Sequence, residues 1–218
     1  MHADVPQRLG DEQAMLLGER AVWLPQHGAL LIADLHLGKG DVFRRAGIAL
    51  PRGGTAEDLQ RLTALLELHA ARQLWILGDM LHGPLHATPW LQQWQQWRAA
   101  LAEVDIHVVR GNHDRALQAE ALGVRLHETS AMLGSLELRH EAPDTADGSG
   151  APHVIAGHIH PLVRLPGLQR RWPVFWLRNH ATILPAFSAF TAGVPVRPLP
   201  GERVVACVEG NAVALPAA

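Results

Sequence analysis

The chain has 218 residues, 48% hydrophobic and 18% charged, so it can bury a full core as a single domain over residues 1–218. A formal net charge of −2 excludes a protein that is basic over its whole surface, so polyanion binding would need a local patch. Cys207 is the only cysteine, which excludes an intramolecular disulfide. With no secretory leader and no apolar run near the roughly 18 residues of a membrane span, the sequence predicts a cytoplasmic protein without membrane contact.

The first part of the chain alternates apolar strands with amphipathic helices. Residues up to 20 are polar and predict at most an edge strand at 15–17, whereas 21–25 and 29–34 predict a strand pair around the turn at 26–28. Residues 37–54 form a glycine-rich connection with one acid, Asp41, and four basic residues: Lys39, Arg44, Arg45 and Arg52. A leucine stripe then predicts a helix that starts at Thr55, with Asp58 completing a capping box, and runs to about residue 71.

A second strand and helix follow in the same order. Residues 73–79 predict a strand, and Thr88 before Pro89 predicts the start of a helix that runs to about residue 103. Trp90, Trp94 and Trp97 share one face of that helix, a spacing typical of core packing, with a base-stacking platform as the alternative. Residues 106–109 predict another strand, and a short helix ends near residue 122.

From residue 123 onward the pattern changes to short strands, with 142–152 as an exposed loop. Strands alternating with helices, followed by a strand meander, predict an α/β fold. We find no internal repeat and no linker long enough to separate a second domain.

Side chains that bind metals follow several of these predicted strands. Asp34 and His36 follow the first, and Asp79 and Asn112 follow the next two. Because residues two apart share one side of a strand, Asp34 and His36 can reach the same point, as can the two histidines of GHIH. The candidate ligands are Asp34, His36, Asp79, Asn112, His140, His158 and His160.

This ligand set combines carboxylate and amide oxygens with imidazole nitrogens, and it contains no thiolate. The mixture suits manganese, iron or zinc better than magnesium and excludes a cysteine-based structural zinc site. Seven ligands are too many for one ion, whereas two divalent ions bridged by one carboxylate use them all. Two ions about 3.5–4 Å apart lower the pKa of a shared water and hold a phosphoryl group for in-line attack, so the predicted reaction is phosphoester hydrolysis.

The ordered motifs DLH, GD, GNHD, a later lone histidine and GHIH resemble the calcineurin-like metallophosphoesterases over residues 30 to 165. Within that superfamily, DLHLGKGDVFRRAGIALPRGG, LGDMLHG, AGHIHP and ILPAFSAFTAG resemble the bacterial DNA-ligase-associated phosphoesterases. The resemblance implies two packed mixed β-sheets flanked by helices in a four-layer αββα arrangement. It also implies two divalent ions, Mn2+ before Fe2+ or Zn2+, and a nuclease that cleaves DNA phosphodiester bonds in repair beside a DNA ligase and a helicase.

Carried over motif by motif, the resemblance divides the ligands between two ions. The first would be held by Asp34, His36, Asp79 and His160. The second would be held by Asp79, Asn112, His140 and His158, with His140 placed mainly by its order in the chain. His113 would protonate the leaving oxygen or neutralise phosphoryl charge, and Asp114 would orient it. Many relatives carry an acid where this chain has His82, which is predicted either to contact substrate or to help orient a ligand.

Other functions remain open on the same residues. A small-molecule phosphatase or a cyclic-nucleotide phosphodiesterase needs the same site, and a non-catalytic scaffold keeps the fold, although the presence of His113 and all seven ligands favours catalysis. Lys39, Arg44 and Arg45 are predicted either to clamp substrate phosphates or to form a solvated loop. The remaining histidines are interpreted as ordinary core or surface residues: His2, His27, His69, His86, His107, His127, His153 and His180.

Overall fold

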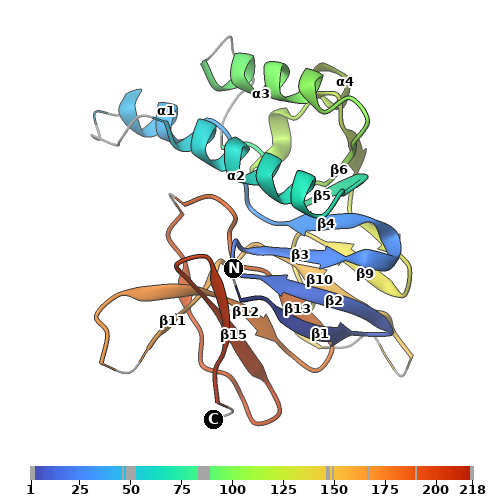
Figure 1. The fold of residues 1–218 in the computed structure, drawn as a ribbon, viewed down its shortest axis with the longest axis vertical. Helices are drawn as coiled ribbons and strands as arrows, with labels where there is room; N and C mark the ends of the chain where they lie inside the picture. The colour runs from blue at the N-terminus through green and yellow to red at the C-terminus, as the bar shows by residue number, and fades with distance from the viewer. Residues whose placement is uncertain are drawn as a thin grey trace.

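The structure is a computed structural model that describes residues 3–45, 47, 53–82, 89–145, 148, 150–165, 167–189 and 191–216. Two β-sheets pack against each other, and the helices cover the first sheet at the top of Figure 1. This arrangement confirms the predicted α/β fold with two mixed sheets.

The first sheet has seven strands that follow one another in chain order. They are β1 (Val5–Leu9), β2 (Glu12–Leu17), β3 (Ala21–Leu24), β4 (Ala29–Ile32), β5 (Gln73–Leu77), β6 (Asp105–Val109) and β7 (Arg125–His127). The first four are antiparallel, whereas β4 to β7 are parallel neighbours. Parallel strands end at the same edge of a sheet, so the loops after β4, β5 and β6 meet there.

The N-terminal hairpin is more extensive than the sequence predicted. Residues 5–17 form β1 and β2, where we expected at most an edge strand at 15–17. Leu9, Ala14 and Leu16 are buried while several neighbours are partly or fully exposed. An antiparallel strand with one covered face tolerates polar residues at alternate positions, which hid the hairpin from the composition.

The described helices all lie between residues 25 and 122. They are η1 (Pro25–His27), α1 (Lys39–Arg45), α2 (Gly54–Leu68), α3 (Pro89–Ala100), η2 (Asp114–Ala116) and α4 (Ala119–Leu122). The predicted capping box at α2 is wrong, because Asp58 is buried and pairs with Arg61 at 3.1 Å instead of capping the helix. Core packing of the tryptophan stripe is confirmed, with Trp90 at 4% and Trp94 at 0% exposure.

The second sheet is built from the strand meander of the second half. Its strands are β8 (Ser130–Leu133), β9 (Leu136–Arg139), β10 (His153–Ala156), β11 (Pro161–Arg164), β12 (Arg171–Leu177), β13 (Ala181–Ile183), β14 (Val194–Pro195), β15 (Arg203–Val208) and β16 (Asn211–Ala214). The order is β14-β11-β12-β13-β10-β9-β8, and β15 pairs with both β12 and β16. Since β9 and β10 are parallel, their carboxyl ends also meet.

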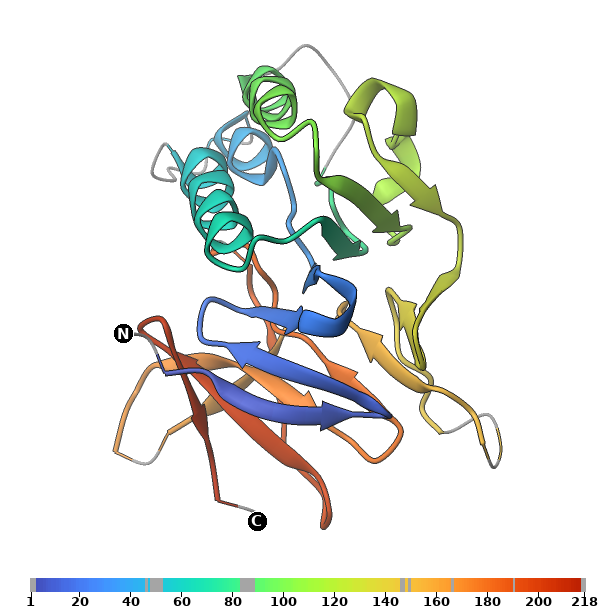
Figure 2. The same cartoon turned by 45° about the vertical axis from the view of Figure 1, so that its right-hand side comes forward.

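Two large apolar cores fix the sheets in place. One core lies between the first sheet and the helices and includes Leu62 and Trp94, and the other joins the sheets through Leu31 of β4 and Phe175 of β12. Full burial of each such side chain contributes about 1.5–3 kcal/mol. The described helices lie on one side of the sheet pair, so no helix in the described residues forms the fourth layer (Figure 2). None of these helices has the length and apolarity needed to cross a membrane.

Candidate metal centre

The first sheet brings carboxylates and an amide to the candidate centre on three adjacent loops. Asp34 and His36 follow β4, Asp79 follows β5, and Asn112 follows β6. The His36 N–H donates to the backbone oxygen of Asp79 at 2.8 Å, which joins the first two loops. The third loop is joined by the His113 N–H, which donates to Asp79 Oδ1 at 2.9 Å.

The candidate ligands of the second sheet are all imidazoles, and the exposed carboxylate of Glu141 lies 4.0 Å from one of them, at His158 Nε2. His140 follows β9, whereas His158 and His160 follow β10. The Gly157 N–H donates to the backbone oxygen of His140 at 3.0 Å, which ties these two loops together. The His158 N–H donates to Asp34 Oδ2 at 3.0 Å, so a carboxylate of the first sheet anchors a loop of the second.

Two groups of ligand atoms are close enough to hold an ion each. Asp34, His36 and His160 form one group and Asp34, Asp79 and His140 the other, with all ligand atoms of a group within 4.8 Å of one another. His160 Nε2 lies 3.4 Å from Asp34 Oδ1, and His140 Nε2 lies 3.6 Å from Asp79 Oδ1. The carboxylate common to both groups is Asp34, whereas the family resemblance implied Asp79 as the bridge.

Asn112 and His158 adjoin the second group. His140 Nε2 lies 2.8 Å from Asn112 Oδ1 and 3.1 Å from His158 Nδ1. The fold therefore brings all seven predicted ligands into one cluster, including His140, which the sequence placed mainly by order.

The imidazoles are oriented as metal-binding histidines are. His160 Nδ1 donates to the backbone oxygen of Ala192 at 2.7 Å, and His140 Nδ1 lies 3.2 Å from that of Leu77. A ring that donates from one nitrogen presents the lone pair of the other. The Nε2 atom of His36 is buried and has no hydrogen-bond partner among the described residues, and the buried Nε2 atom of His160 faces the Asp34 carboxylate. A buried polar atom without a partner is costly, so the donor set fits a bound cation.

The backbone is strained where the ligands attach. Positive φ angles occur at Asp34 (55°), His36 (49°), Asp79 (47°), His158 (75°) and His160 (50°). Eight non-glycine residues of the described chain have positive φ, and five of them are candidate ligands. Such positions cost on the order of 1–3 kcal/mol each and cluster at functional sites, so the strain points to a constraint imposed by ligand geometry.

The glycines of the motifs leave no room for a side chain. A Cβ atom at Gly78 would overlap the ring of His140, and one at Gly111 would overlap the backbone and carboxylate of Asp79. A Cβ atom at Gly157 would overlap the carboxylate of Asp34. These glycines therefore let the ligand loops cross at close range.

Charge and burial set the protonation of two of the ligands. Burial, helped by the positive charge of Lys39, lowers the pKa of His36 to about 2, so this ring is neutral and able to bind a metal near pH 7. Burial also lowers the pKa of His160, but hydrogen bonding and charge from Asp34 outweigh it and the net shift is upward. The Asp34 carboxylate thus favours a positive charge at the point where a cation would bind.

His113 lies at the exposed rim of this cluster. Its ring centroid is 5.6 Å from that of His36 and 5.2 Å from that of His82, on which it stacks. Asp114 does not hold this ring, because its two carboxylate oxygens accept backbone N–H groups at 2.9 Å each. The expected role of Asp114 is corrected accordingly: this buried carboxylate fixes the turn that carries His113, and not its imidazole.

His82 adjoins both the candidate ligand His36 and His113, with its ring centroid 5.2 Å from each of theirs. Its Nδ1 is 3.3 Å from His36 Nδ1, and its ring stacks on Phe43 with centroids 5.9 Å apart. Burial is the main reason that its pKa falls to about 4, so the ring is neutral at pH 7. Of the two predicted roles, this geometry favours the orientation of a ligand.

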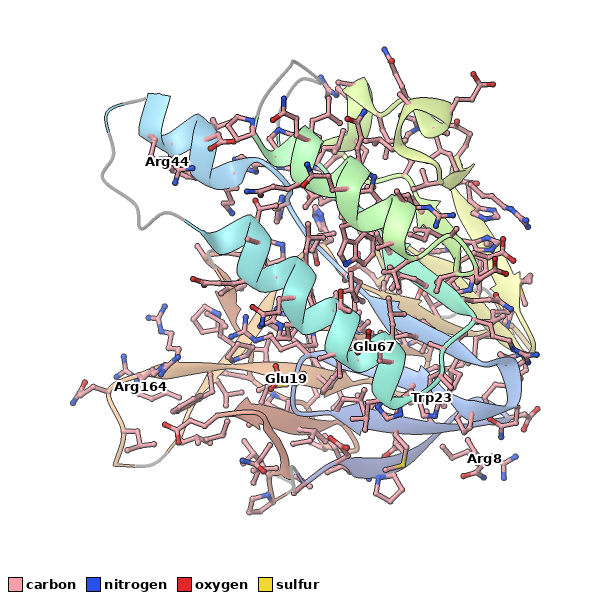
Figure 3. The ribbon with its side chains drawn as sticks, turned by 45° about the horizontal axis from the view of Figure 1, so that its top comes forward. Arg8, Glu19, Trp23, Arg44, Glu67 and Arg164 are labelled. Atoms are coloured by element: carbon pink, nitrogen blue, oxygen red, sulfur yellow. The ribbon has the colours of Figure 1, made fainter. Side chains whose placement is uncertain are left out.

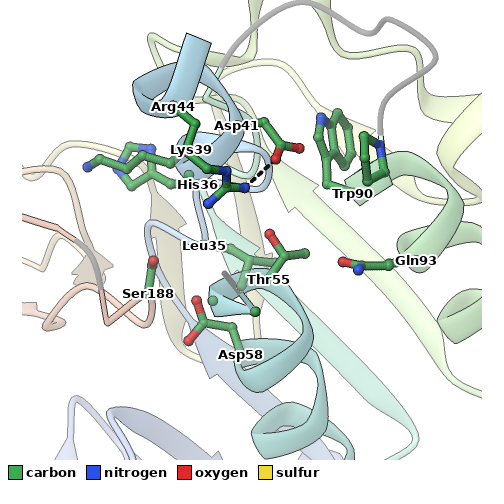
Figure 4. Close-up of a pocket in the computed structure, with 14 residues that line it drawn as sticks. Leu35, His36, Lys39, Asp41, Arg44, Thr55, Asp58, Trp90, Gln93 and Ser188 are labelled. Carbon is green, nitrogen blue, oxygen red and sulfur yellow. Dashed lines mark hydrogen bonds and ion pairs between the residues drawn. The ribbon is translucent and has the colours of Figure 1, made fainter. Parts of the chain in front are cut away.

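A cavity of about 400 Å³ opens beside His36 and is lined by Lys39 and Arg44 (Figure 4). Arg44 forms an ion pair with Asp41, which lies three positions earlier on the same helix α1. Burial lowers the pKa of Lys39 below its usual value, although the carboxylates of Asp34 and Asp79 act in the opposite direction.

The other two basic residues of the predicted patch are Arg45 and Arg52. Arg45 ends α1, and only its backbone is described. Arg52 lies outside the described residues.

Several residues that line this cavity were not found from the sequence. Thr55 and Asp58 come from α2, Gln93 from α3, and Ser188 from the segment after β13. Burial raises the pKa of Asp58 to about 6 although Arg61 lowers it. No motif signals these residues because they converge only in the fold.

The histidines interpreted as ordinary residues lie apart from the cluster where they are described. His27 lies 3.0 Å from Glu12 Oε2, and the rings of His107 and His127 stack with centroids 5.3 Å apart. His2 and His86 lie outside the described residues.

Comparison with known proteins gives a family and a related structure. The family model for calcineurin-like phosphoesterases matches residues 29–184, which include every candidate ligand. The fold is similar to the crystal structure of Pseudomonas putida nuclease MPE, with a TM-score of 0.83 and 32% identity over 97% of this chain and 100% of that chain. A protein of unknown function from Aquifex aeolicus, AQ665, matches 61% of this chain and 78% of that chain with 18% identity and a TM-score of 0.43. No curated protein matches the sequence.

Proposed function

The chain belongs to the calcineurin-like phosphoesterase family, and on that premise we propose that it is a two-metal phosphodiesterase that cleaves DNA. That it hydrolyses phosphoric esters follows from the family. The observation that supports a nuclease is the similarity to Pseudomonas putida nuclease MPE over 97% of this chain. We also propose that residues 1–218 act as one domain, since the core between the sheets takes side chains from both halves.

In this proposal the seven clustered side chains hold two divalent ions. Asp34, His36, Asp79 and His160 bind the first, and Asp79, Asn112, His140 and His158 bind the second. When bound, the ions supply Lewis acidity for the phosphoryl oxygens and a water of lowered pKa. The ligands mix carboxylate and imidazole without thiolate, which suits Mn2+, Fe2+ or Zn2+, and among these we favour Mn2+ because of the family resemblance.

Asp79 is proposed as the shared carboxylate because its loop lies between the other two of the first sheet. It already accepts the His113 N–H at 2.9 Å and lies 3.6 Å from His140 Nε2. Asp34 Oδ1 lies 3.4 Å from His160 Nε2, which supports its assignment to the first ion.

His113 is proposed to protonate the leaving oxygen or to neutralise phosphoryl charge. Its ring is at the exposed rim, where it can reach a substrate, and its backbone is held by Asp79. Asp114 supports it indirectly by holding the turn. Lys39 and Arg44 are proposed to bind substrate phosphates in the cavity beside His36, with Arg45 next to them in the sequence.

We further propose that the enzyme acts in the cytoplasm in DNA repair, beside a DNA ligase and a helicase. This context comes from the resemblance of four long motifs to the ligase-associated phosphoesterases. A small-molecule phosphatase or a cyclic-nucleotide phosphodiesterase would use the same ligands, so the substrate must be tested directly.

The test is one assay panel on the purified protein. Bis-p-nitrophenyl phosphate and p-nitrophenyl phosphate are compared with manganese, zinc, magnesium or a chelator, followed by single-stranded, nicked and duplex DNA. We expect manganese-dependent hydrolysis of the diester in preference to the monoester, together with DNA cleavage. Preference for the monoester, or diester hydrolysis without cleavage of any DNA, would contradict the nuclease. Full activity in the chelator would contradict the metal requirement.

A further inference from the structure

The charge of the second half of the chain is strongly one-sided. Between residues 148 and 201 the sequence contains five arginines but no lysine, aspartate or glutamate, although the whole chain has a net charge of −2. The five are Arg164, Arg170, Arg171, Arg178 and Arg197. Arg178 lies 3.6 Å from Glu202, whereas the other four are exposed.

Arg164 and Arg171 face each other on adjacent strands. They are a registered pair of the antiparallel ladder between β11 and β12, so their side chains leave the same face of the sheet. Like charges directly opposite each other destabilise a ladder, and no acidic partner of either guanidinium is found in the described part of the chain. Arg170 adjoins them and lies over Trp172, 4.3 Å from the ring centroid. A surface that retains such a pair at an electrostatic cost indicates an anionic ligand.

This arginine surface is continuous with the metal centre. β11 begins one residue after His160, and a cavity of about 160 Å³ is lined by His160, Leu162, Arg170 and Arg171 among others. Arg164 is four residues from His160, about 13 Å along an extended strand. A polymer bound at the centre can therefore reach these arginines, whereas a small diester cannot.

The hairpin and α1 flank the candidate centre as two separate basic surfaces. The cavity beside α1 is lined by His36, whose ring centroid lies 5.4 Å from that of His160 in the other cavity. The segment 186–189 borders both cavities. In Figure 3, Arg44 on α1 and Arg164 on β11 lie toward the same side of the molecule.

We propose that the β11–β12 hairpin, through Arg164, Arg170 and Arg171, binds the sugar–phosphate backbone of the nucleic acid beyond the cleaved bond, an inference that rests on the proposed function. Guanidinium groups bind phosphates in a bidentate manner. A distance of about 13 Å covers several phosphates of a strand. A nucleic acid fits better than an acidic protein, because the arginines continue outward from a centre that hydrolyses phosphoric esters.

The experiment compares Arg164→Ala combined with Arg171→Ala against the wild-type enzyme with manganese. The value of kcat/KM is measured for single-stranded oligonucleotides from two to about twenty nucleotides, over a series of salt concentrations, with bis-p-nitrophenyl phosphate as the reference. Each phosphate that is no longer neutralised flattens the slope of log affinity against log salt by about 0.7, so we expect a change of about 1.4. The deficit should grow with oligonucleotide length and should exceed that on the small diester at least tenfold.

The matched control is Arg8→Ala combined with Arg125→Ala. It removes the same charge from exposed arginines that pair with acids, and it should keep the wild-type slope. If the wild type cleaves DNA and both double variants behave alike, the hairpin inference is overturned while the nuclease stands. If the wild type hydrolyses the small diester but no oligonucleotide, the nuclease fails and the inference fails with it. Inhibition of DNA cleavage by polyglutamate is compared with inhibition by a second oligonucleotide. Equally strong inhibition by the two, lost in the Arg164→Ala and Arg171→Ala variant, would show that the surface binds acidic polymers in general and would overturn the nucleic-acid assignment.

Discussion

The first sheet brings the candidate-ligand carboxylates Asp34 and Asp79 to the centre, whereas all three candidate ligands of the second sheet are imidazoles. Both sheets use the same device, in which polar residues follow the carboxyl ends of adjacent parallel strands. The sheets differ in the charge that they deliver. Carboxylates are ligands that can bring negative charge to a cation, whereas imidazoles bind metals in their neutral form and complete the coordination without adding charge.

Backbone hydrogen bonds join loops within each sheet. The second sheet is also anchored to the first, because the His158 N–H donates to the Asp34 carboxylate. Removal of a first-sheet carboxylate charge should therefore weaken metal binding, and at Asp34 it should also weaken the hydrogen bond that holds the His158 loop. The experiments below test this difference, from the largest expected effect to the smallest.

The largest effect is expected from the proposed bridge. Asp79→Asn removes one charge from both ions and should lose most of the activity and most of both metals, whereas Asp34→Asn should retain part of the second ion. Elemental analysis of the purified variants, with rates on bis-p-nitrophenyl phosphate, measures this. Since Asp34 is the carboxylate common to both ligand groups, a reversed order would make Asp34 the bridge.

His113 belongs to the first sheet but is proposed to act on substrate and not on metal. His113→Ala should keep both ions and lose about 10²–10⁴-fold in activity on DNA, where the leaving group is an alkoxide that needs a proton. The deficit should shrink on a nitrophenolate leaving group, which needs little protonation. Loss of metal, or equal deficits on both substrates, would contradict this role.

His82 adjoins both His36 and His113, and its replacement distinguishes the two roles left open by the sequence. His82→Phe keeps a ring of similar shape but removes the contact of Nδ1 with His36 Nδ1 at 3.3 Å. We expect a loss of metal affinity of about 10–100-fold, the usual cost of losing a group that orients a ligand. Titration with manganese measures it, and an effect on KM with unchanged metal affinity would assign His82 to substrate.

The basic flank of the first sheet should matter less than the centre itself. Arg44→Ala with Arg45→Ala should weaken DNA cleavage and flatten its dependence on salt by about 0.7–0.9 for each phosphate that these arginines neutralise in the wild type. The loss on the small diester should be much smaller. Normal DNA cleavage at every salt concentration would make this loop a solvated surface, and equal losses on both substrates would make it a support of the fold.

Asp58 links the two halves of the chain, because this residue of α2 forms a hydrogen bond with Ser188, which follows β13. Its folded pKa is raised to about 6, so the neutral form is favoured in the folded protein and stability is lost as pH rises from about 4 through 6. The loss amounts to at most about 3 kcal/mol at 1.36 kcal/mol per pKa unit. Asp58→Asn should reduce this pH dependence. Urea unfolding at pH 5 and pH 7 measures it, and the same pH dependence in both proteins would contradict it.

Much of the candidate centre could be predicted because its signal is local. Asp34, Asp79 and Asn112 each follow an apolar strand, and parallel strands carry such residues to one edge whatever the details of packing. The role of the motif glycines was not readable, because a Cβ atom at Gly78, Gly111 or Gly157 would meet residues of other loops that are distant in the sequence. The N-terminal hairpin was not readable, because one exposed face allows polar residues at every second position.

By itself, the sequence determined the order of the ligands, their chemistry and the α/β alternation that places them at strand ends. Only the tertiary structure decided that the two ligand groups share Asp34, that Asp114 holds backbone and not the His113 ring, and that Asp58 is buried beside Arg61. It also decided that Arg164 and Arg171 are paired across two strands. The physical reason is range: periodicity and turn chemistry act over a few residues, whereas these contacts join atoms from distant segments whose distances are set by packing of the two sheets.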